Sequence, residues 1–196
     1  MRSTCRVLGA VALAAAAAGC AVAARIGMVR KDVLSDAQQV VADAQFNHGD
    51  MTIQAAVDRA DTTYSPGQPI ALSVKTSKNA YVAILRVLAS GETTIVFPNR
   101  DRRDAAIAAD TALTVPGPRD VVKIAADKPG VVLFEFIAST TTVNNAWVFT
   151  RAPDKGSDFA DLGVTTRNIV KDLLGVLKIG PGHDTAATYL TIRIAG

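Results

Sequence analysis

The stretch VVLFEFIA, Val131 to Ala138, carries the strongest strand signal in this 196-residue chain. Its residues are apolar on both faces of a strand, and Glu135 is the exception. The stretch is short, rich in β-branched and aromatic residues, and preceded by the turn residues Lys128-Pro129-Gly130. These properties favour a buried strand over a helix.

Other segments alternate between apolar and polar residues with the period of two that is typical of strands. The run Ala80 to Leu88 is more continuously apolar and predicts a central strand, and Ser90-Gly91-Glu92 would turn it back into a hairpin. Thr62 to Pro69 has the composition of a turn. About eight short strands separated by turns predict a mainly β fold, an antiparallel β-sandwich of the immunoglobulin-like or a related kind. Besides the two runs already named, the expected strands are Ile53 to Val57, Ile70 to Val74, Thr93 to Phe97, Val121 to Ala125, Trp147 to Thr150 and Thr188 to Ala195.

Two helices are expected outside the sandwich. Ser35-Asp36-Ala37-Gln38 has the form of a capping box and predicts a helix from Asp36 to Phe46. A second helix would begin at Thr165 or Thr166 and end before Gly180-Pro181-Gly182. Its apolar stripe consists of Ile169, Val170, Leu173, Leu174 and Leu177. Without a repeat or a low-complexity linker, we expect residues 36–196 to form one domain.

The N-terminal residues have the pattern of a targeting segment. Arg2 and Arg6 precede an apolar stretch from Val7 to Ala18, which is shorter than the roughly 20 residues that a permanent membrane span requires. Ala17-Ala18-Gly19-Cys20 resembles the lipobox of bacterial lipoproteins, in which the cysteine is acylated after removal of the signal peptide, here residues 1–19. This resemblance implies a lipid anchor on Cys20, a tether over 20–35 and, since alanine follows the cysteine, the outer membrane. Cleavage after Ala23 would instead release a soluble periplasmic protein.

Charge and cysteine content exclude several functions. The formal charge of +3 includes Arg2 and Arg6, so the mature chain would carry only about +1, which gives no support to nucleic-acid binding. Cys5 would leave with the signal peptide and Cys20 would carry the lipid. We therefore expect neither a disulfide nor a cysteine-based metal site, and no cofactor.

Residues from about Met51 to Ser139 resemble the bacterial family called domain of unknown function 4384. The similarity rests on Tyr64 to Gln68, on Asn79 to Val82, on the nine residues GETTIVFPN from Gly91 to Asn99, on Val115-Pro116, and on the late strand ending at Ile137. Gln68 stands where the family often has an acidic residue. The family occurs in secreted and envelope proteins, and the resemblance implies a β-sandwich module without implying a reaction.

The most charged stretch, Asn99 to Asp104, supplies the candidate binding loop. Guanidinium groups form bidentate contacts with the phosphates or carboxylates of glycans, lipids or partner proteins. The alternative is a solvated loop of Arg–Asp pairs, with Phe97-Pro98-Asn99 as a strand-ending turn whose ring lies in the core and whose Asn side chain binds the backbone. The candidate residues are Phe97, Pro98, Asn99, Arg100, Arg102 and Arg103.

Catalytic residues are scarce. The histidines are His48 and His183, no thiol would remain, and neither a Gly-x-Ser-x-Gly turn nor a phosphate-binding glycine motif occurs. The sequence therefore predicts a non-enzymatic envelope lipoprotein module, held to the membrane by Cys20, that binds a protein partner or an envelope polymer. Two alternatives stay open: a periplasmic hydrolase that uses His183 and Asp184, and a structural component of a secretion or surface assembly.

Overall fold

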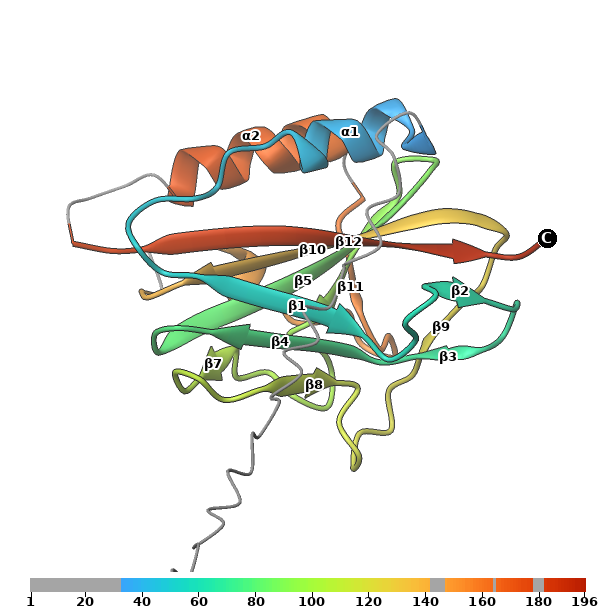
Figure 1. Ribbon diagram of the computed structural model, residues 1–196, viewed down its shortest axis with the longest axis horizontal. Coiled ribbons are helices and arrows are strands. Elements are labelled where there is room, and N and C mark those ends of the chain that lie inside the picture. The colour runs from blue at the N-terminus through green and yellow to red at the C-terminus, as the bar shows by residue number, and fades with distance from the viewer. Residues whose placement is uncertain (1–32, 142–146, 164, 178–181) are drawn as a thin grey trace, which may run out of the picture.

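The computed structural model describes residues 33–141, 147–163, 165–177 and 182–196 (Figure 1). Cys20 and the expected signal peptide lie outside the described residues. The helical elements are α1 (Asp36–Ala42), the 3₁₀ helix η2 (Trp147–Phe149) and α2 (Thr166–Leu177). The strands are β1 (Ile53–Val57), β2 (Thr63–Tyr64), β3 (Pro69–Ile70), β4 (Leu72–Thr76), β5 (Ala80–Leu88), β6 (Thr93–Phe97), β7 (Ala106–Ile107), β8 (Leu113–Val115), β9 (Ile124–Ala125), β10 (Gly130–Ser139), β11 (Ala160–Asp161) and β12 (Thr185–Ile194).

The strands form a β-sandwich, as the sequence predicts. The larger sheet has the order β11-β6-β5-β10-β12-β2. The short strand β7 pairs with the first two residues of β5, Ala80 and Tyr81. The second layer consists of the sheet β1-β4-β8 and the pair β3-β9. The pairs are antiparallel except for the short parallel contact between β12 and β2.

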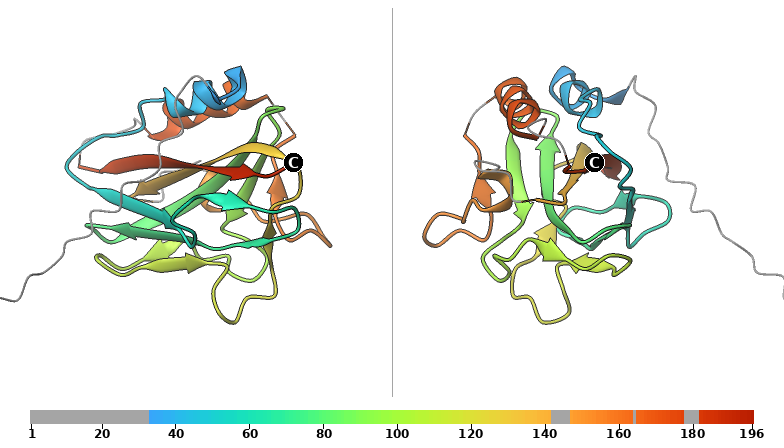
Figure 2. Two further views of the ribbon diagram at one scale, coloured as in Figure 1. Left: turned by 45° about the vertical axis from the view of Figure 1, so that its right-hand side comes forward. Right: turned by 90° about the vertical axis from the view of Figure 1, so that its left-hand side faces the viewer.

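Both helices lie side by side on the outer face of the larger sheet (Figures 1 and 2). Val87 of β5 is paired with Thr93 and with Leu133, so these three side chains share a face. Thr93 reaches α2 through Thr166, which identifies that face as the one beneath the helices. The opposite face, with Phe134 of β10, lies against Ile70 and Ala125 of the β3–β9 pair, with which it lines a small cavity.

The central strand β10 is consequently covered from both sides. From Val131 to Ser139 every residue is buried, and its neighbours β5 and β12 are each paired with it over most of their lengths. This arrangement explains why the sequence of β10 is apolar on both faces, a pattern that a sheet with one solvated face does not show.

The first helix is held by its cap and by one buried amide. The expected capping box is confirmed: the Ser35 hydroxyl accepts from the backbone N–H of Gln38, and the Gln38 side chain accepts from the N–H of Ser35. Gln38 Nε2 also donates to the carbonyls of Val87 and Val131, at 3.1 and 2.9 Å. The helix ends at Ala42, four residues before the predicted end at Phe46, whose side chain enters the core.

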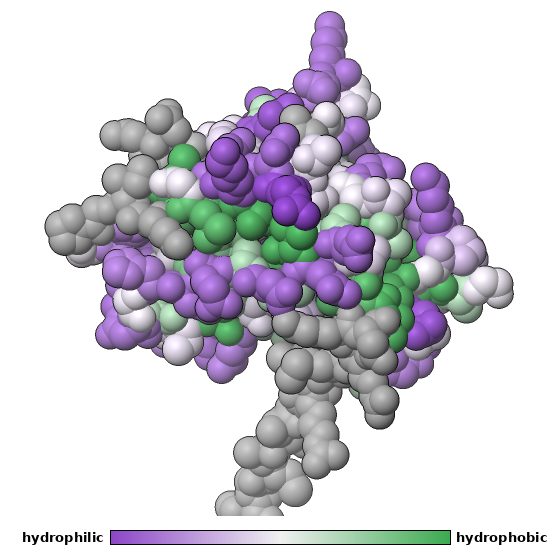
Figure 3. Space-filling view, turned by 90° about the horizontal axis from the view of Figure 1, so that it is seen from above, coloured by the Kyte–Doolittle hydropathy of each residue, from purple (hydrophilic) through white to green (hydrophobic). Residues whose placement is uncertain are grey.

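The second helix has the amphipathic pattern expected of it. Ile169, Leu173 and Leu177 are buried, whereas Arg167 and Lys171 are exposed. Seen from above, this face carries a strip of apolar side chains between two rows of polar ones (Figure 3). Among the described residues, no helix has the length and apolarity to cross a membrane.

Four local predictions are wrong or incomplete. The strand expected from Ile70 to Val74 is divided between β3, which ends at Ile70, and β4, which begins at Leu72 in another sheet. Trp147 to Thr150 is not a strand: the 3₁₀ helix η2 places Val148 and Phe149 in the core. The strand expected over Val121 to Ala125 is reduced to β9, because the first two N–H groups of the stretch bind a carboxylate instead of a neighbouring strand. The expected turn from Thr62 to Pro69 includes β2, which pairs with β12.

Glu135 is the exception in the apolar pattern of β10. It is paired with Tyr189 and shares the face of Leu133 beneath the helices. Only 3% of the residue is exposed, and its Oε2 atom has no hydrogen-bond partner within the described parts of the chain. Burial raises the pKa of this carboxyl well above its ordinary value of 4.5. The folded protein therefore favours the protonated, neutral form.

We predict that Glu135→Gln stabilises the protein increasingly as the pH rises. Because the pKa of Glu135 is higher in the folded than in the unfolded chain, deprotonation of the unfolded chain above about pH 4.5 reduces the stability of the wild type. Glutamine cannot ionise and avoids this loss. Urea unfolding at about pH 4 and about pH 8 should show a larger advantage of the variant at the higher pH. An advantage that is the same at both would contradict this account of Glu135.

Candidate functional site

Phe97, Pro98 and Asn99 build the candidate loop from the inside. The Phe97 ring is 1% exposed, Asn99 is fully buried, and the peptide bond between Phe97 and Pro98 is cis. Asn99 Nδ2 donates to the Val96 carbonyl at 3.2 Å, and Asn99 Oδ1 accepts from the N–H groups of Asp101 and Arg102 at 3.0 Å each. This geometry agrees with the interpretation of the triplet as a strand-ending turn. Its side chains shape the loop and are not exposed to a ligand.

Arg100 and Arg102 are engaged with carboxylates from elsewhere in the chain. Arg100 Nη1 lies 2.7 Å from Asp158 Oδ1. Arg102 Nη2 lies 3.1 Å from Asp120 Oδ2 and donates to the Thr114 carbonyl, and its guanidinium lies 5.4 Å from the centre of the Phe97 ring. An exposed ion pair contributes only ~0–1 kcal/mol to the free energy of unfolding. The partly buried Arg102 also connects the candidate loop to the segment that contains Thr114 and Asp120.

Two aspartates join the candidate loop to the loop over 116–123. Asp101 Oδ2 accepts from the N–H groups of Val121 and Val122 at 2.6 and 2.7 Å. Asp120 Oδ2 accepts from the Gly117 N–H at 2.6 Å, in addition to its pair with Arg102. The two carboxylates are thus directed inward, toward the backbone that they hold.

The outer surface of the joined loops is basic. Arg103, Arg119 and Lys123 are exposed, and Val121 between them is 73% exposed. We call these four residues the basic tip. Within the described chain, no carboxylate lies at ion-pair distance from any of the three cations.

Sequence reasoning identified Arg103 but missed the other members of the basic tip. Val121 and Lys123 were assigned to the strand expected over Val121 to Ala125, and neither that strand nor Arg119 gave a reason to group these residues with a loop about twenty positions earlier. The Asp101 contacts with the Val121 and Val122 backbone bring the two segments together, and no local pattern indicates such contacts.

His183 and Asp184, the residues of the hydrolase alternative, have structural contacts. His183 is buried, with 5% of the residue exposed. Its Nε2 lies 2.9 Å from the carbonyl of Leu177, the last residue of α2, and its ring lies 5.6 Å from that of His48. Asp184 pairs with Lys78, its N–H donates to the Thr140 hydroxyl, and its carbonyl accepts from the Thr140 N–H. His183 therefore contacts the end of α2, whereas Asp184 takes part in a salt bridge.

Lys78 binds Asp184 and Asp50 together. The hydrogen bond from Lys78 to Asp184 is the main cause that raises the pKa of Lys78, and the hydrogen bond to Asp50 is the next. The hydrogen bond from Lys78 lowers the pKa of Asp50. Between the two carboxylates, Gly49 has a φ of +78°, and a Cβ at this position would lie 2.0 Å from Asp184 Oδ1. Glycine is therefore required by both the backbone conformation and the space.

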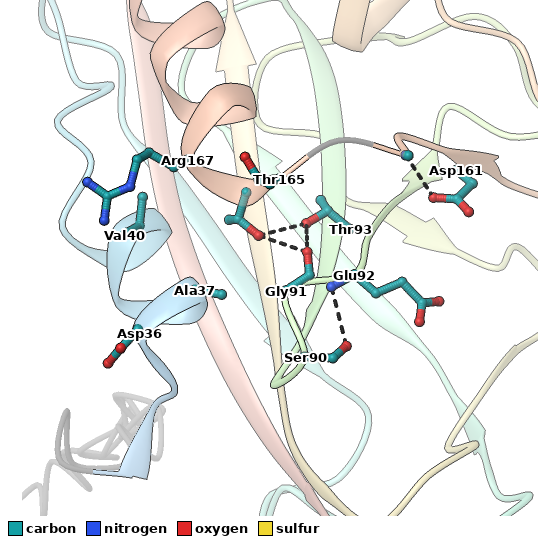
Figure 4. Close-up of a pocket in the computed structure, with 12 residues that line it drawn as sticks. Asp36, Ala37, Val40, Ser90, Gly91, Glu92, Thr93, Asp161, Thr165 and Arg167 are labelled. Carbon is teal, nitrogen blue, oxygen red and sulfur yellow. Dashed lines mark hydrogen bonds between the residues drawn. The ribbon is translucent and has the colours of Figure 1, made fainter.

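A cleft of about 540 Å³ opens where the first turns of both helices meet the β5–β6 hairpin (Figure 4). Thr166 closes its floor, because its hydroxyl donates to the Gly91 carbonyl at 2.8 Å and lies 3.3 Å from the Thr93 hydroxyl. Asp36 and Glu92 on its rim point away from each other (Figure 4). The rim thus carries dispersed charges and no convergent set of groups.

The described residues contain no group of three His, Cys, Asp or Glu side chains that could hold a metal ion.

Replacing Asn99 by alanine should lower the free energy of unfolding much more than replacing Arg103 by alanine. Asn99→Ala removes the side-chain partner of three backbone groups, of which the Val96 carbonyl is buried, and should cost about 2–3 kcal/mol of unfolding free energy. Arg103→Ala should change it by less than about 0.5 kcal/mol, since the side chain is exposed and unpaired among the described residues. Asn99→Asp keeps an acceptor but sets an oxygen against the Val96 carbonyl and buries a charge, so it should cost at least as much as Asn99→Ala. Urea unfolding measures all three, and equal losses for Asn99→Ala and Arg103→Ala would contradict this division of roles.

Comparison with known proteins agrees with the resemblance inferred from the sequence. Residues 63–142 match the model of the family described as Domain of unknown function (DUF4384). The match covers β2 to the end of β10 and includes the candidate loop and the basic tip, but less than half of the chain. No curated protein and no solved structure is detectably similar to the chain. The chain is therefore similar to the DUF4384 family over residues 63–142.

Proposed function

We propose that this protein is a lipid-anchored module of the bacterial cell envelope that binds a protein partner or an envelope polymer and catalyses no reaction. The anchor is the acylated Cys20 of the lipobox-like sequence, and the location is the outer membrane. A soluble periplasmic form, cleaved after Ala23, is the alternative to the anchor.

The basic tip carries this proposal. Its three cations and one apolar side chain stand on two loops that are fixed to each other by Asp101 and Asp120. A fixed surface of unpaired charge loses little conformational freedom when a ligand binds, which is favourable for recognition. These outer side chains hold the loops less than Asn99 and Arg102 do: the contact recorded among them is a long, exposed hydrogen bond from Lys123 Nζ to the Asp120 carbonyl, at 3.4 Å.

The geometry at His183 favours this function over a hydrolase. A general base requires a ring nitrogen free to accept a proton from a nucleophile at hydrogen-bond distance. The His183 ring is buried, with 5% of the residue exposed, and its Nε2 atom contacts the Leu177 carbonyl, whereas Asp184 is paired with Lys78; neither side chain is presented to a substrate. A structural role in a secretion or surface assembly remains the second candidate, since the same tip could serve as an assembly contact.

The anchor is tested by metabolic labelling with an alkyne fatty acid. The wild type should incorporate the label and fractionate with membranes, and Cys20→Ser should do neither, because the proposed lipid is attached through the thiol of Cys20. Equal labelling of both proteins would contradict acylation at Cys20, and an unlabelled, soluble wild type would contradict the anchor and support cleavage after Ala23.

The binding function is tested by crosslinking in cells that express the full-length tagged protein. We expect one envelope protein or polymer to be recovered with it, in amounts that fall when Arg103, Arg119 and Lys123 are replaced by alanine. Recovery that is unchanged in this variant would contradict a function of the basic tip. Hydrolysis of an envelope polymer by the purified wild type, lost in His183→Asn, would support the hydrolase instead.

A further inference from the structure

The basic tip has a definite excess of positive charge. Arg103, Arg119 and Lys123 have no carboxylate partner among the described residues, whereas the acidic neighbours Asp101 and Asp120 are directed inward. The exposed Asp104, next to Arg103 in the sequence, accepts from the Ala106 N–H. The surface is therefore complementary to an anionic ligand.

An apolar residue stands among these cations. Val121 is the most exposed of the large apolar residues in the described chain, at 73%, against 41% for Val33. It is also held in place, because its backbone N–H and that of Val122 bind Asp101. A carbohydrate polymer offers little apolar surface to such a side chain, whereas a protein surface or a membrane does.

The basic tip has little apolar surface. The loop over 116–123, yellow-green at the bottom of Figure 1, lies on the side of the molecule opposite to α1 and α2, and Figure 2 shows the same separation from two more directions. Membrane binding strengthens with the apolar area that a surface buries. The basic tip offers one exposed apolar side chain, Val121, which suits a contact with a protein better than insertion into a membrane.

These observations point to a protein partner, and we infer that the basic tip binds an acidic protein segment that carries an apolar residue. Arg103, Arg119 and Lys123 pair with carboxylates of the segment, the two arginines in bidentate geometry. Val121 packs against its apolar side chain. The inference rests on the proposed function as a binding module and names the class of its partner.

The inference is tested by fluorescence anisotropy with the purified mature protein and a short labelled peptide of alternating glutamate and leucine. We expect saturable binding that weakens as salt increases, because exposed charge pairs are screened. Arg119→Ala with Lys123→Ala should weaken binding about tenfold. The matched control, Arg167→Ala with Lys171→Ala, removes the same two charges from the exposed face of α2 and should leave binding unchanged. Val121→Ser should also weaken it.

Three results would overturn the inference. The first is absence of binding to the peptide. The second is equal weakening by the two double variants, which would mean attraction by net charge alone. The third is tighter binding to phosphatidylglycerol vesicles or to polygalacturonate than to the peptide, with no effect of Val121→Ser.

The failure of this inference differs from the failure of the proposed function. If crosslinking in cells recovers a partner that does not depend on the basic tip, the binding module stands and the assignment of its surface is wrong. If neither crosslinking nor fatty-acid labelling gives a product, the proposed function itself is wrong.

Discussion

Burial of β10 on both faces is the constraint on which the rest of the structure depends. A strand that is apolar on both sides requires a covering layer on each side of its sheet. One layer is made by the sheets β1-β4-β8 and β3-β9, and the other by α1 and α2. The short helix α1 is fixed to this arrangement by Gln38, whose amide binds carbonyls of both central strands. The same arrangement buries the carboxyl of Glu135, which destabilises the fold least in its protonated form.

The same constraint leaves the loops farthest from the helices free to vary. The segments 97–104 and 116–123 contribute Phe97, Pro98, Asn99 and Val122 to the buried interior and otherwise lie nearer the surface. They are ordered by side-chain contacts with the backbone, from Asn99, Asp101 and Asp120, and not by pairing in a sheet. A surface of this kind can change its outer residues without cost to the fold, as function-bearing loops on rigid scaffolds generally do.

Sequence patterns predict the elements whose signals are local. β5 and β6 have the predicted bounds, β10 is longer by one residue at each end, and the capping box at Ser35 and Gln38 is present. The short strands were missed because pairing with distant segments defines them: β2 is a strand only through its contact with β12. Trp147 to Thr150 has a strand-like composition, but a single turn of 3₁₀ helix buries its apolar residues equally well.

The candidate site was predictable to a similar degree. A turn at Phe97-Pro98-Asn99 follows from the residue types, and the structure agrees. The carboxylate partners of Arg100 and Arg102 do not follow, since Asp158 and Asp120 are distant in the sequence. For the same reason the sequence could not show which arginine remains free. The Gly-Pro-Gly turn before His183 indicates a surface loop, yet the contact with the end of α2 buries the ring.

Site-specific photo-crosslinking in cells tests the central claim most directly, namely that the basic tip and not the cleft beside the helices contacts the partner. A photoreactive amino acid would replace Val121 in one protein and Glu92, on the rim of the cleft, in another. The account predicts a discrete crosslinked protein from position 121 and none from position 92. The same product from position 92 alone would contradict it and move the binding site to the cleft.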